Sequence, residues 1–434
     1  MKKIFSIVML LAGWCLASCN EDVQEVVVSH SGEKMSVRAV IGNQPDSRVV
    51  LTQQDNGNIK TEWKAGDAFL GVAGSDVISF TDAKLNGSTA DFTPNANVED
   101  GTVVNALYPL TEDLATVAAS ADGFEISLAS QNGTLEGLAD YTYMTANATA
   151  ANETLDFTFK HEIVILRLTG MTLPEGVTSV SEVVVSGSGI SDVAMANLSG
   201  ATPTVAVSAT DCSVNVKGNF TVTNKVMEDV YVAFFPTSDA TEFTVKVLGS
   251  DSKPYRYSHP NTVKFEAGNV YTLSEKELLM KYEEGDYYDD GEKEGVVVEV
   301  DDDGKHGKII SMDEATQKWR NPGLYMLEPN PVSDKNDGEK NTKYIVSINQ
   351  QNNCPAFKWC LNKGNDWYLP ALNQWTKINI SLINEALKEY GGTEIKQNVK
   401  YWTSTMKDNQ NAYLSFSGSQ LVINNALVRA FCNF

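Results

Sequence analysis

The chain has 434 residues, of which 42% are hydrophobic and 21% are charged, and its formal net charge is −22. This length predicts about three domains, and the apolar content is sufficient for buried cores. Nucleic acids and anionic membrane surfaces attract clusters of Lys and Arg, so the acidic composition argues against both, and we expect no nucleic-acid partner.

Residues 1–18 have the features of a cleavable bacterial lipoprotein signal peptide. An apolar segment from Ile4 follows two lysines and is closed by Leu16-Ala-Ser-Cys19. The segment is too short for a membrane-spanning helix. Cleavage before Cys19 would expose it for attachment of lipid, such as palmitate, whose acyl chains anchor a protein by about 0.8 kcal/mol per CH₂ group. An ordinary signal peptide followed by a chance cysteine is the alternative.

The expected mature chain begins with acidic residues directly after the lipid-bearing cysteine. Asn20-Glu-Asp22 resembles the signal that sends lipoproteins of Bacteroides-type bacteria to the outer cell surface. The resemblance implies an outer-membrane lipoprotein that is exposed on the cell surface or on a fimbria.

Residues 26–273 are predicted to form short β-strands separated by turns, without a persuasive helix. β-branched residues dominate the runs, and Gly, Asn, Asp and Ser separate them. The alternation in Phe243-Thr-Val-Lys-Val247 is typical of a sheet with one wet face, as in a sandwich. The predicted strands cover residues 35–41, 68–72, 77–80, 155–159, 163–168, 180–185, 226–235 and 243–247.

Five landmarks occur in order along this region, at residues 59–69, 106–109, 131–146, 157–161 and 265–273. In the first, Trp63 with Gly66-Asp67 suits a buried anchor followed by a turn. His161 is isolated between apolar strands, so a structural core histidine is favoured over a metal ligand, and no metal site is predicted. The ordered landmarks resemble those of the fimbrillin family from Bacteroides-type bacteria.

The fimbrillin resemblance implies a two-part transthyretin-like β-sandwich over residues 19–275 and assembly with other fimbrial subunits by strand exchange. In that scheme a trypsin-like protease cuts after a basic residue, the first strand leaves, and a neighbour's donor strand fills the groove. Val26 to Val28 is a candidate for the removable strand. Arg48 follows a turn-like, accessible stretch, whereas Arg38 lies inside a predicted strand, and Lys34 is also near. Both arginines are equally well explained as ordinary surface residues.

An acidic, glycine-interrupted linker is expected at residues 276–295, and the following unit at 296–434 differs in kind. Strands at residues 296–300 and 307–311 flank a turn. The only persuasive helix covers residues 370–390, because its apolar residues recur at helical spacing and Gly391-Gly392 ends it.

Several aromatic motifs lie in the C-terminal unit, and two of them are the most specific: Trp367-Tyr-Leu-Pro370 and Tyr401-Trp-Thr-Ser-Thr405. From about residue 283 onward the chain resembles the C-terminal domain first described in a Legionella collagen-like adhesin, which is related to the C-type lectin fold. The resemblance implies an α+β C-type-lectin-like domain. The motifs themselves are favoured as core residues over ligand-stacking residues, because paired aromatics supply large buried area. The ligand-binding residues are not identified.

Two segments have partial calcium-loop character, Glu328-Pro-Asn330 and Asp334-Lys-Asn-Asp-Gly338. The first lies outside the expected helix-to-strand context, and the second lacks its downstream acidic ligand. Exposed turns are the favoured interpretation of both segments.

Four cysteines remain for disulfides in an exported chain, and Cys360 with Cys432 is slightly preferred as a pair, which leaves Cys212 and Cys354 free. Cys354 and Cys360 are also the only close pair that an oxidase of the same broad fold could use. No activating cluster lies beside them, and no hydrolase, zinc-protease or phosphate-binding motif occurs. We therefore expect a non-enzyme without a cofactor.

The leading hypothesis is a mainly β surface lipoprotein that acts as a tip or minor fimbrial adhesin. It would be anchored to the outer membrane through lipid before assembly by protease-triggered strand exchange, and its C-terminal domain would bind a glycan or protein ligand. The alternative is a stand-alone, lipid-anchored glycan- or protein-binding module that does not polymerise.

Overall fold

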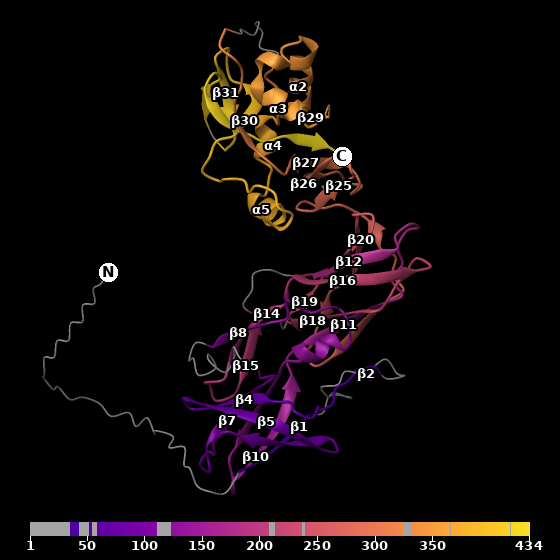
Figure 1. Cartoon of the computed structure of the whole chain (residues 1–434), viewed down its shortest axis with the longest axis vertical. Coiled ribbons are helices and arrows are strands. Elements are labelled where there is room, and N and C mark those ends of the chain that lie inside the picture. Colours follow the sequence, from indigo (N-terminus) through magenta and orange to yellow (C-terminus); the bar gives the residue numbers. More distant parts are fainter. Residues whose placement is uncertain are drawn as a thin grey trace, which may run out of the picture.

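Three β-rich units are stacked along the long axis of the protein in a computed structural model (Figure 1). The structure describes residues 35–42, 52–53, 59–110, 123–207, 213–236, 239–323, 332–364, 366–416 and 418–434. Within these ranges no helix has the length and apolar character needed to cross a membrane. Some sequence-based predictions concern residues outside these ranges: the signal peptide with Cys19, the segment from Val26 to Val28, Lys34, Arg48, Cys212 and Glu328-Pro-Asn330.

The first unit is a closed seven-stranded barrel. Its first strand runs parallel to β10 and antiparallel to β6, whereas the other neighbouring strands are antiparallel to one another. The order around the barrel is β1 (Ser36–Ile41), β10 (Thr154–His161), β9 (Met144–Thr149), β7 (Val103–Tyr108), β4 (Phe69–Ala73), β5 (Asp76–Asn86) and β6 (Thr89–Pro94). A short pair precedes β4, formed by β2 (Thr52–Gln53) and β3 (Ile59–Lys60).

Aromatic rings fill the barrel. Phe69 stacks on Phe80 with their ring centroids 4.5 Å apart. Trp63 is buried and meets three further rings edge to face, those of Phe92, Tyr108 and Phe159. Such pairs contribute about 0.5–1.5 kcal/mol beyond their area burial. The prediction of a buried Trp63 before a turn is confirmed, and Gly66 in that turn has φ of +88°.

The second unit is a sandwich of two sheets around an aliphatic core. The four-stranded sheet has the order β13 (Ile190–Ser191), β18 (Val230–Pro236), β11 (Val164–Thr169) and β23 (Val270–Ser274). The six-stranded sheet has the order β17 (Val226–Met227), β16 (Ser213–Thr223), β12 (Ser179–Ser186), β20 (Thr244–Gly249), β21 (Pro254–Ser258) and β24 (Leu279–Met280). All eight predicted runs contain strands, although the run at 226–235 is divided into β17 and β18.

The barrel and the sandwich share a second apolar cluster. Successive residues of β18 point to opposite faces, so Val232 lies in the sandwich core while Tyr231 and Ala233 pack toward Leu70 and Leu107 of the barrel. Smaller elements complete this region: β8 (Phe124–Ser127), β14 (Val193–Asn197) and β15 (Thr204–Val207) form one sheet, β19 (Ala240–Thr241) pairs with β22 (Val263–Lys264), and η1 (Gly137–Tyr141) is a short 3-10 helix. The two units therefore form one continuous body.

The third unit combines a five-stranded sheet with helices on both faces. The sheet has the order β25 (Tyr287–Asp289), β26 (Glu294–Val300), β27 (Gly307–Ser311), β34 (Phe431–Asn433) and β29 (Trp367–Tyr368). Val297 and Ile309 face a cluster with α2 (Gly338–Ser347) and α3 (Pro355–Leu361), whereas Val296 and Ile310 face α5 (Ile380–Glu389). The remaining elements are β28 (Ala315–Lys318) with β33 (Asn425–Val428), β30 (Trp402–Met406), β31 (Asn411–Leu414), β32 (Ser419–Leu421), η2 (Gln351–Asn353) and α4 (Leu372–Trp375).

The helix predicted at residues 370–390 is two helices. The Asn379 side chain accepts a hydrogen bond from the Leu382 amide at 3.4 Å and so begins α5 as an N-cap. The predicted stop is confirmed, because Gly391 has φ of +76° directly after the helix. Sequence reasoning missed α2 and α3, although Asp337 caps the first and Pro355 occupies the first turn of the second.

Residues 276–295, expected as a linker, are structured and form the joint between the sandwich and the third unit. β24 pairs with β21 of the sandwich, whereas β25 belongs to the third unit's sheet. Arg256 of β21 bonds to Asp286 at 2.8 Å, and both side chains are 7% exposed. Arg256 also contacts Glu283 at 3.2 Å, and Lys246 lies 3.5 Å from Asp286. The joint is therefore held by ion pairs as well as by main-chain pairing.

Candidate functional site

The position of β1 in the barrel is the first candidate site. β1 has a backbone partner at six positions of β10 and at four positions of β6. Val37 and Ala39 point into the barrel core together with Met35, while Ser36 and Arg38 face solvent. Removal of β1 would leave the facing backbone groups of β6 and β10 unpaired and would expose the apolar interior between them.

Arg38 lies within this strand, as predicted. Its backbone is opposite Asp91 of β6 on one side and Asp156 of β10 on the other. Its side chain lies 3.9 Å from the Asp91 carboxylate, and both side chains are at least half exposed, so the pair contributes about 0–1 kcal/mol. A protease needs an extended, accessible backbone. Because both edges of the strand are paired, the peptide bond after Arg38 is protected while the barrel is closed.

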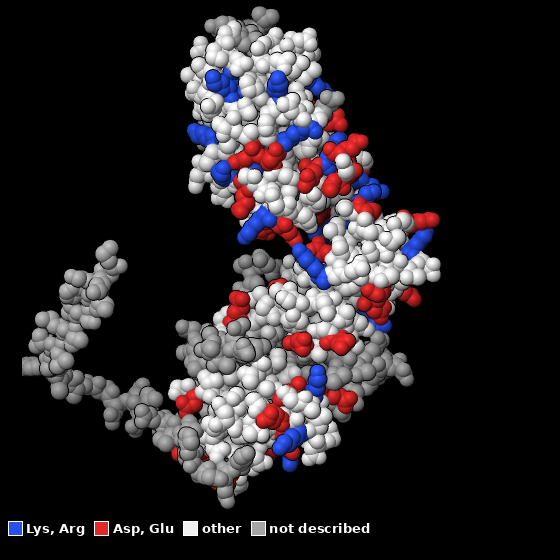
Figure 2. Space-filling model, in the orientation of Figure 1, with Lys and Arg blue, Asp and Glu red and all other residues white. Residues whose placement is uncertain are grey.

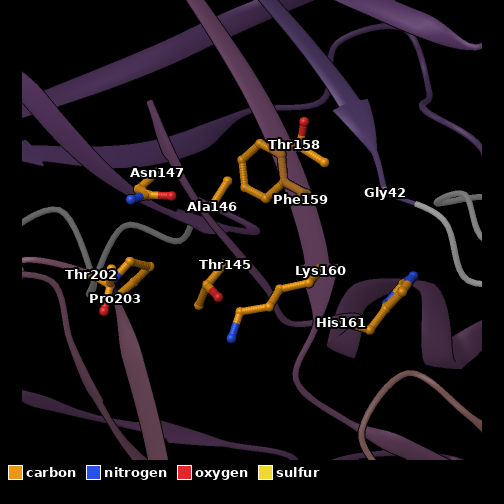
Figure 3. Close-up of a pocket in the computed structure, with 10 residues that line it drawn as sticks. All are labelled: Gly42, Thr145, Ala146, Asn147, Thr158, Phe159, Lys160, His161, Thr202 and Pro203. Atoms are coloured by element: carbon orange, nitrogen blue, oxygen red, sulfur yellow. The ribbon is translucent and has the colours of Figure 1, made fainter. Parts of the chain in front are cut away.

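A pocket of about 440 Å³ lies at the end of β1, between β9 and β10 (Figure 3). Gly42, which follows β1, forms one edge, and Thr202 and Pro203 form the opposite wall. The two strands are paired there only at Lys160 with Thr145 and at His161 with Met144. The Thr145 hydroxyl donates to the Glu162 carboxylate at 2.5 Å. Few main-chain pairs therefore hold β9 and β10 together beside the end of β1.

His161 lines this pocket as a neutral side chain. Its Nε2 atom is buried and has no hydrogen-bond partner among the described residues. Burial lowers the pKa of His161 to about 4, because the charged imidazolium loses its hydration there. Among the described residues, no group of three His, Cys, Asp or Glu side chains is placed to hold a metal ion.

The landmark at residues 131–146 joins the barrel side of the molecule to the sandwich. The buried Gln131 side chain accepts the Ala233 amide at 2.7 Å and donates to the Ala233 carbonyl at 2.9 Å. The Tyr231 amide donates to the Gly133 carbonyl at 2.9 Å, and a Cβ at Gly133 would lie 2.7 Å from the Phe220 ring. This landmark is therefore built for packing against β18.

The aromatic motifs of the third unit also lie in its core. Trp367, Tyr368, Tyr401 and Trp402 are each at most 4% exposed. The Trp402 indole donates to the Gln317 carbonyl at 2.9 Å, so its polar atom is satisfied inside the unit. These positions favour the packing interpretation, because buried rings are not presented to a ligand.

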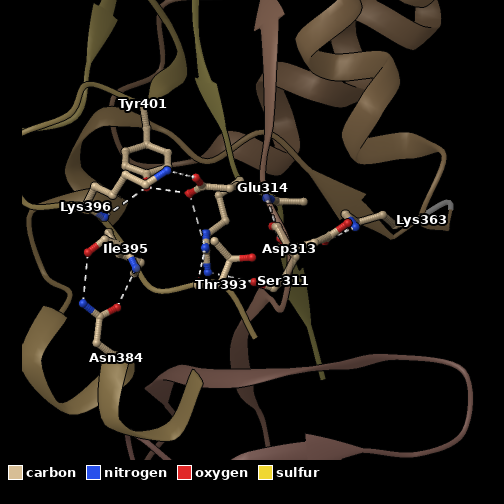
Figure 4. A network of polar contacts seen from close by, with 11 residues as sticks. Ser311, Asp313, Glu314, Lys363, Asn384, Thr393, Ile395, Lys396 and Tyr401 are labelled. Carbon is tan, nitrogen blue, oxygen red and sulfur yellow. Dashed lines mark hydrogen bonds and ion pairs between the residues drawn. The ribbon is translucent and has the colours of Figure 1, made fainter. Parts of the chain in front are cut away.

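A buried polar network ties three segments of the third unit together (Figure 4). Arg429 is fully buried, and its guanidinium donates to the carbonyls of Ser311 and Thr393. Glu314 accepts from Tyr401 at 2.7 Å and pairs with Lys396 at 2.7 Å, while Arg429 lies 3.4 Å away.

The partners of this network determine the charge of Glu314. Burial alone would raise the pKa of its carboxyl group, but hydrogen bonds from Lys396 and Tyr401 and the charge of Arg429 lower it overall. Glu314 is therefore ionised at neutral pH.

Asp334 belongs to a helix-capping turn. Its carboxylate accepts the amides of Asn336 at 2.9 Å and Asp337 at 3.1 Å and pairs with Lys340 at 3.0 Å. Asp337 in turn accepts the Lys340 amide at 2.8 Å at the start of α2. These hydrogen bonds lower the pKa of Asp334. The carboxylates are thus engaged in capping α2.

The three described cysteines are free and buried, so the expected pairing of Cys360 with Cys432 is not present in the structure. Cys360 lies on α3 and Cys432 on β34, where both thiols contribute to the apolar cluster beneath the sheet. Burial raises the pKa of Cys354 to about 12 and that of Cys432 to about 11, and it also raises the pKa of Cys360. Protonated thiols are poor nucleophiles, so neither Cys354 nor Cys360 has the state that oxidase chemistry needs.

A second pocket, of about 390 Å³, lies on the third unit, where it is bounded by α2, η2 and β29. Sequence reasoning did not identify it. Trp367 and Tyr368 of the aromatic motif line it, although that motif was assigned to the core, and Val346 of α2 is 40% exposed. The lining residues are Glu339, Thr342, Lys343, Val346, Gln351, Leu361, Asp366, Trp367 and Tyr368.

The family-model match lies in the barrel, the sandwich and the start of the joint. A family model described as fimbrillin-like matches residues 49–276. A candidate cell adhesion protein from Bacteroides ovatus is 13% identical with a TM-score of 0.40, covering 58% of this chain and 96% of its own. A fimbrial protein from Bacteroides ovatus is 15% identical with a TM-score of 0.28, covering 93% and 100%.

A fimbrial assembly protein from Parabacteroides distasonis is 15% identical with a TM-score of 0.30, covering 57% of this chain and 93% of its own. No curated protein matches the chain.

Proposed function

Because the chain belongs to the fimbrillin-like family, we propose that it is a cell-surface fimbrial subunit or adhesin that assembles with other fimbrial subunits. Delivery as an outer-membrane lipoprotein through Cys19 is part of this proposal, and the support for it is the lipobox in the sequence. The role is structural and adhesive, without an enzymatic activity. The raised pKa values of Cys354 and Cys360 argue against thiolate chemistry at these two residues.

The observation that carries the proposal is the position of β1 between β6 and β10. A cut after Arg48 would leave β1 on the released N-terminal piece, held only by strand pairing and by its inward side chains. A donor strand from a neighbouring subunit could then pair with both β6 and β10, and its alternate side chains could fill the positions of Val37 and Ala39. Arg48 is preferred over Arg38, because the backbone at Arg38 is paired on both sides.

A terminal position in the fimbria is the second part of the proposal. β34 is an interior strand of the third unit's sheet, between β27 and β29. Phe434 packs against Tyr282 and Tyr288, with ring centroids 5.1 Å and 4.7 Å apart. A strand held in this way cannot leave to complete a neighbour, so this subunit would accept a donor strand but would not supply one from its described C-terminal residues.

The third unit would then be a C-type-lectin-like domain that binds a glycan or protein ligand. Support comes from the aromatic motifs, which together form the core of one α+β unit, and from the pocket beside β29. The two parts of residues 35–274 would correspond to the transthyretin-like halves that the fimbrillin resemblance implies.

Protease processing tests this function. Trypsin-like treatment of the full chain, mixed with a donor-strand peptide or a second fimbrial subunit, should yield detergent-resistant complexes on gels. Arg48→Ala should abolish the complexes, whereas Arg38→Ala should leave them unchanged and serves as the matched control. Complexes that persist in Arg48→Ala, or the presence of lipid and residues 26–42 in purified fibres, would overturn the strand-exchange mechanism.

The second candidate function is the stand-alone, lipid-anchored binding module. It is favoured by the pairing of β1 with both β10 and β6, which closes the barrel without a strand from another subunit. Protease-treated protein that stays monomeric with every tested subunit would support this function.

A further inference from the structure

The barrel core leaves room for only a small side chain in the middle of β1. Ala39 lies opposite Phe157 of β10 on one side and opposite Ala90 of β6 on the other. All three side chains are at most 1% exposed and belong to one apolar cluster. Opposite residues of an antiparallel pair have Cβ atoms about 4.5–5.5 Å apart, so the methyl groups of Ala39 and Ala90 adjoin. We call the position between Phe157 and Ala90 the Ala39 space.

Aromatic rings close the Ala39 space on the side of β10. The Phe157 ring lies 5.2 Å from the Phe69 ring and 5.5 Å from the Phe80 ring, measured between centroids. The packing behind these rings is also tight, because a Cβ added at Gly71 would lie 2.7 Å from the Phe80 ring and 2.8 Å from a methyl carbon of Val104. Phe157 therefore cannot move away from a larger neighbour without displacing the other rings.

The neighbouring inward positions of β1 hold larger side chains. Val37 lies opposite Leu155 and Phe92, and it is 1% exposed. Ile41 lies opposite Phe159 at the end of the strand, where it is half-buried. The inward row of β1 therefore reads valine, alanine and isoleucine, with the smallest side chain in the middle.

We propose that the Ala39 space selects the strand that replaces β1. The fitting partner is an extended segment of another subunit that places alanine or glycine in this space and an aliphatic side chain two residues away on each side. A leucine or an aromatic residue there would have to displace Phe157 or Ala90, and overpacking of a well-packed core is unfavourable. This inference rests on the proposed strand exchange and specifies which donor strands it accepts.

A series of peptides tests the inference on the full chain, after trypsin-like cleavage and inhibition of the protease. The parent peptide has the sequence of residues 35–42, and its variants carry Ala39→Val and Ala39→Leu. Competition with the labelled parent should give at least about tenfold weaker binding of Ala39→Leu, with Ala39→Val in between. A general preference for β-forming, apolar residues would give the opposite order. Equal or tighter binding of the Ala39→Leu peptide would overturn the inference.

Two further substitutions locate the restriction. Ser36→Leu in the peptide is the matched control, because Ser36 is exposed on the other face of the strand, and it should change the affinity by no more than about threefold. Ala90→Gly in the chain removes the methyl group opposite Ala39 and should restore part of the binding of the Ala39→Val peptide. An Ala90→Gly chain that still rejects this peptide as strongly would overturn the assignment of the Ala39 space.

The two proposals fail separately. A cleaved chain that binds the parent and the Ala39→Leu peptide equally well exchanges its strand without this selection, which overturns the inference alone. A cleaved chain that binds none of the peptides and forms no complex with a second subunit overturns the strand exchange itself, and the inference with it.

Discussion

The first and last described strands of the molecule are each paired on both edges, but the apolar cores around them differ. β1 inserts between two strands of the barrel, but it is short, and its buried contribution comes from Met35, Val37 and Ala39. β34 is shorter still, yet it lies inside a sheet with apolar clusters on both faces, and Phe434 after it packs against two tyrosines. Because both strands are paired on both edges, we expect the amount of core that is lost with a strand to decide whether it can leave.

Residues 315–434 of the third unit differ in charge from the rest of the chain. Residues 315–434 hold 13 of the 34 Lys and Arg residues but only 9 of the 56 Asp and Glu residues. On the face in Figure 2, acidic side chains gather at the base of the third unit, near the sandwich, and Lys and Arg dominate its far end. The net negative charge of the chain therefore lies in residues 1–314, which include the first strands of the third unit.

The largest expected effect comes from a charge in β1. Val37→Asp would place an unpaired carboxylate in the barrel core, where Val37 is 1% exposed, and should cost more than about 4 kcal/mol of local stability. β1 should then leave without proteolysis, so a labelled peptide with the sequence of residues 35–42 should bind to the variant. Ser36→Asp, on the exposed face of the same strand, is the control and should not bind the peptide. No peptide binding to Val37→Asp would show that β1 is not exchangeable.

Arg429→Met tests the rigidity of the third unit. The substitution removes a fully buried cation from Glu314 and leaves two carbonyls without their donor, so a loss of about 3–5 kcal/mol is expected. Tryptophan fluorescence during urea unfolding reports this unit, which contains five of the seven tryptophans. The control is Lys343→Met, whose exposed pair with Glu339 should contribute less than about 1 kcal/mol. Similar losses in both variants would contradict the role of the network.

Acidification should destabilise the barrel at a higher pH than the third unit. The folded-state pKa of His161 lies below its usual value of 6.5, so its contribution is complete above pH 6.5 and is lost as the pH falls toward about 4. The expected loss is at most about 3 kcal/mol. Glu314 also has a lowered pKa, so its contribution begins to disappear only below its usual value of 4.5.

Hydrogen exchange at pH 7, 5.5 and 4.5, resolved by peptide, should therefore show the barrel opening first. His161→Gln removes the titrating group and should abolish the dependence between pH 6.5 and 4.5. A barrel that opens equally in this variant would assign the effect to another group.

The smallest effect concerns the joint. Arg256→Ala leaves Asp286 with Lys246 as its charged partner and with the Glu283 amide at 2.8 Å, and it should weaken the joint by about 2 kcal/mol, because one partner of a nearly buried pair is lost. Small-angle scattering should show a broader distribution of distances between the sandwich and the third unit. Lys217→Ala, which removes the exposed pair with Glu389, should change little and serves as the control. An unchanged distribution in Arg256→Ala would show that main-chain pairing alone holds the joint.

Local sequence features predicted the elements whose causes are local. The runs of β-branched residues became strands, Gly391 ended a helix, and Arg38 lies in a strand as expected. α2 was missed because its apolar positions are few, and the helix at 370–390 was overextended because an Asn379 cap interrupts a continuous apolar pattern. The preferred disulfide followed from composition alone, and the two sulfurs belong to different elements of one apolar cluster.

The sequence by itself determined the strand-rich character of the chain, the lipobox and the ordered fimbrillin landmarks, because these depend on residues close together along the chain. Only the tertiary structure decided the place of β1 between β6 and β10, the burial of Arg429 and the pairing of Arg256 with Asp286. These features join residues far apart in sequence, and their energies depend on burial, which no local pattern specifies.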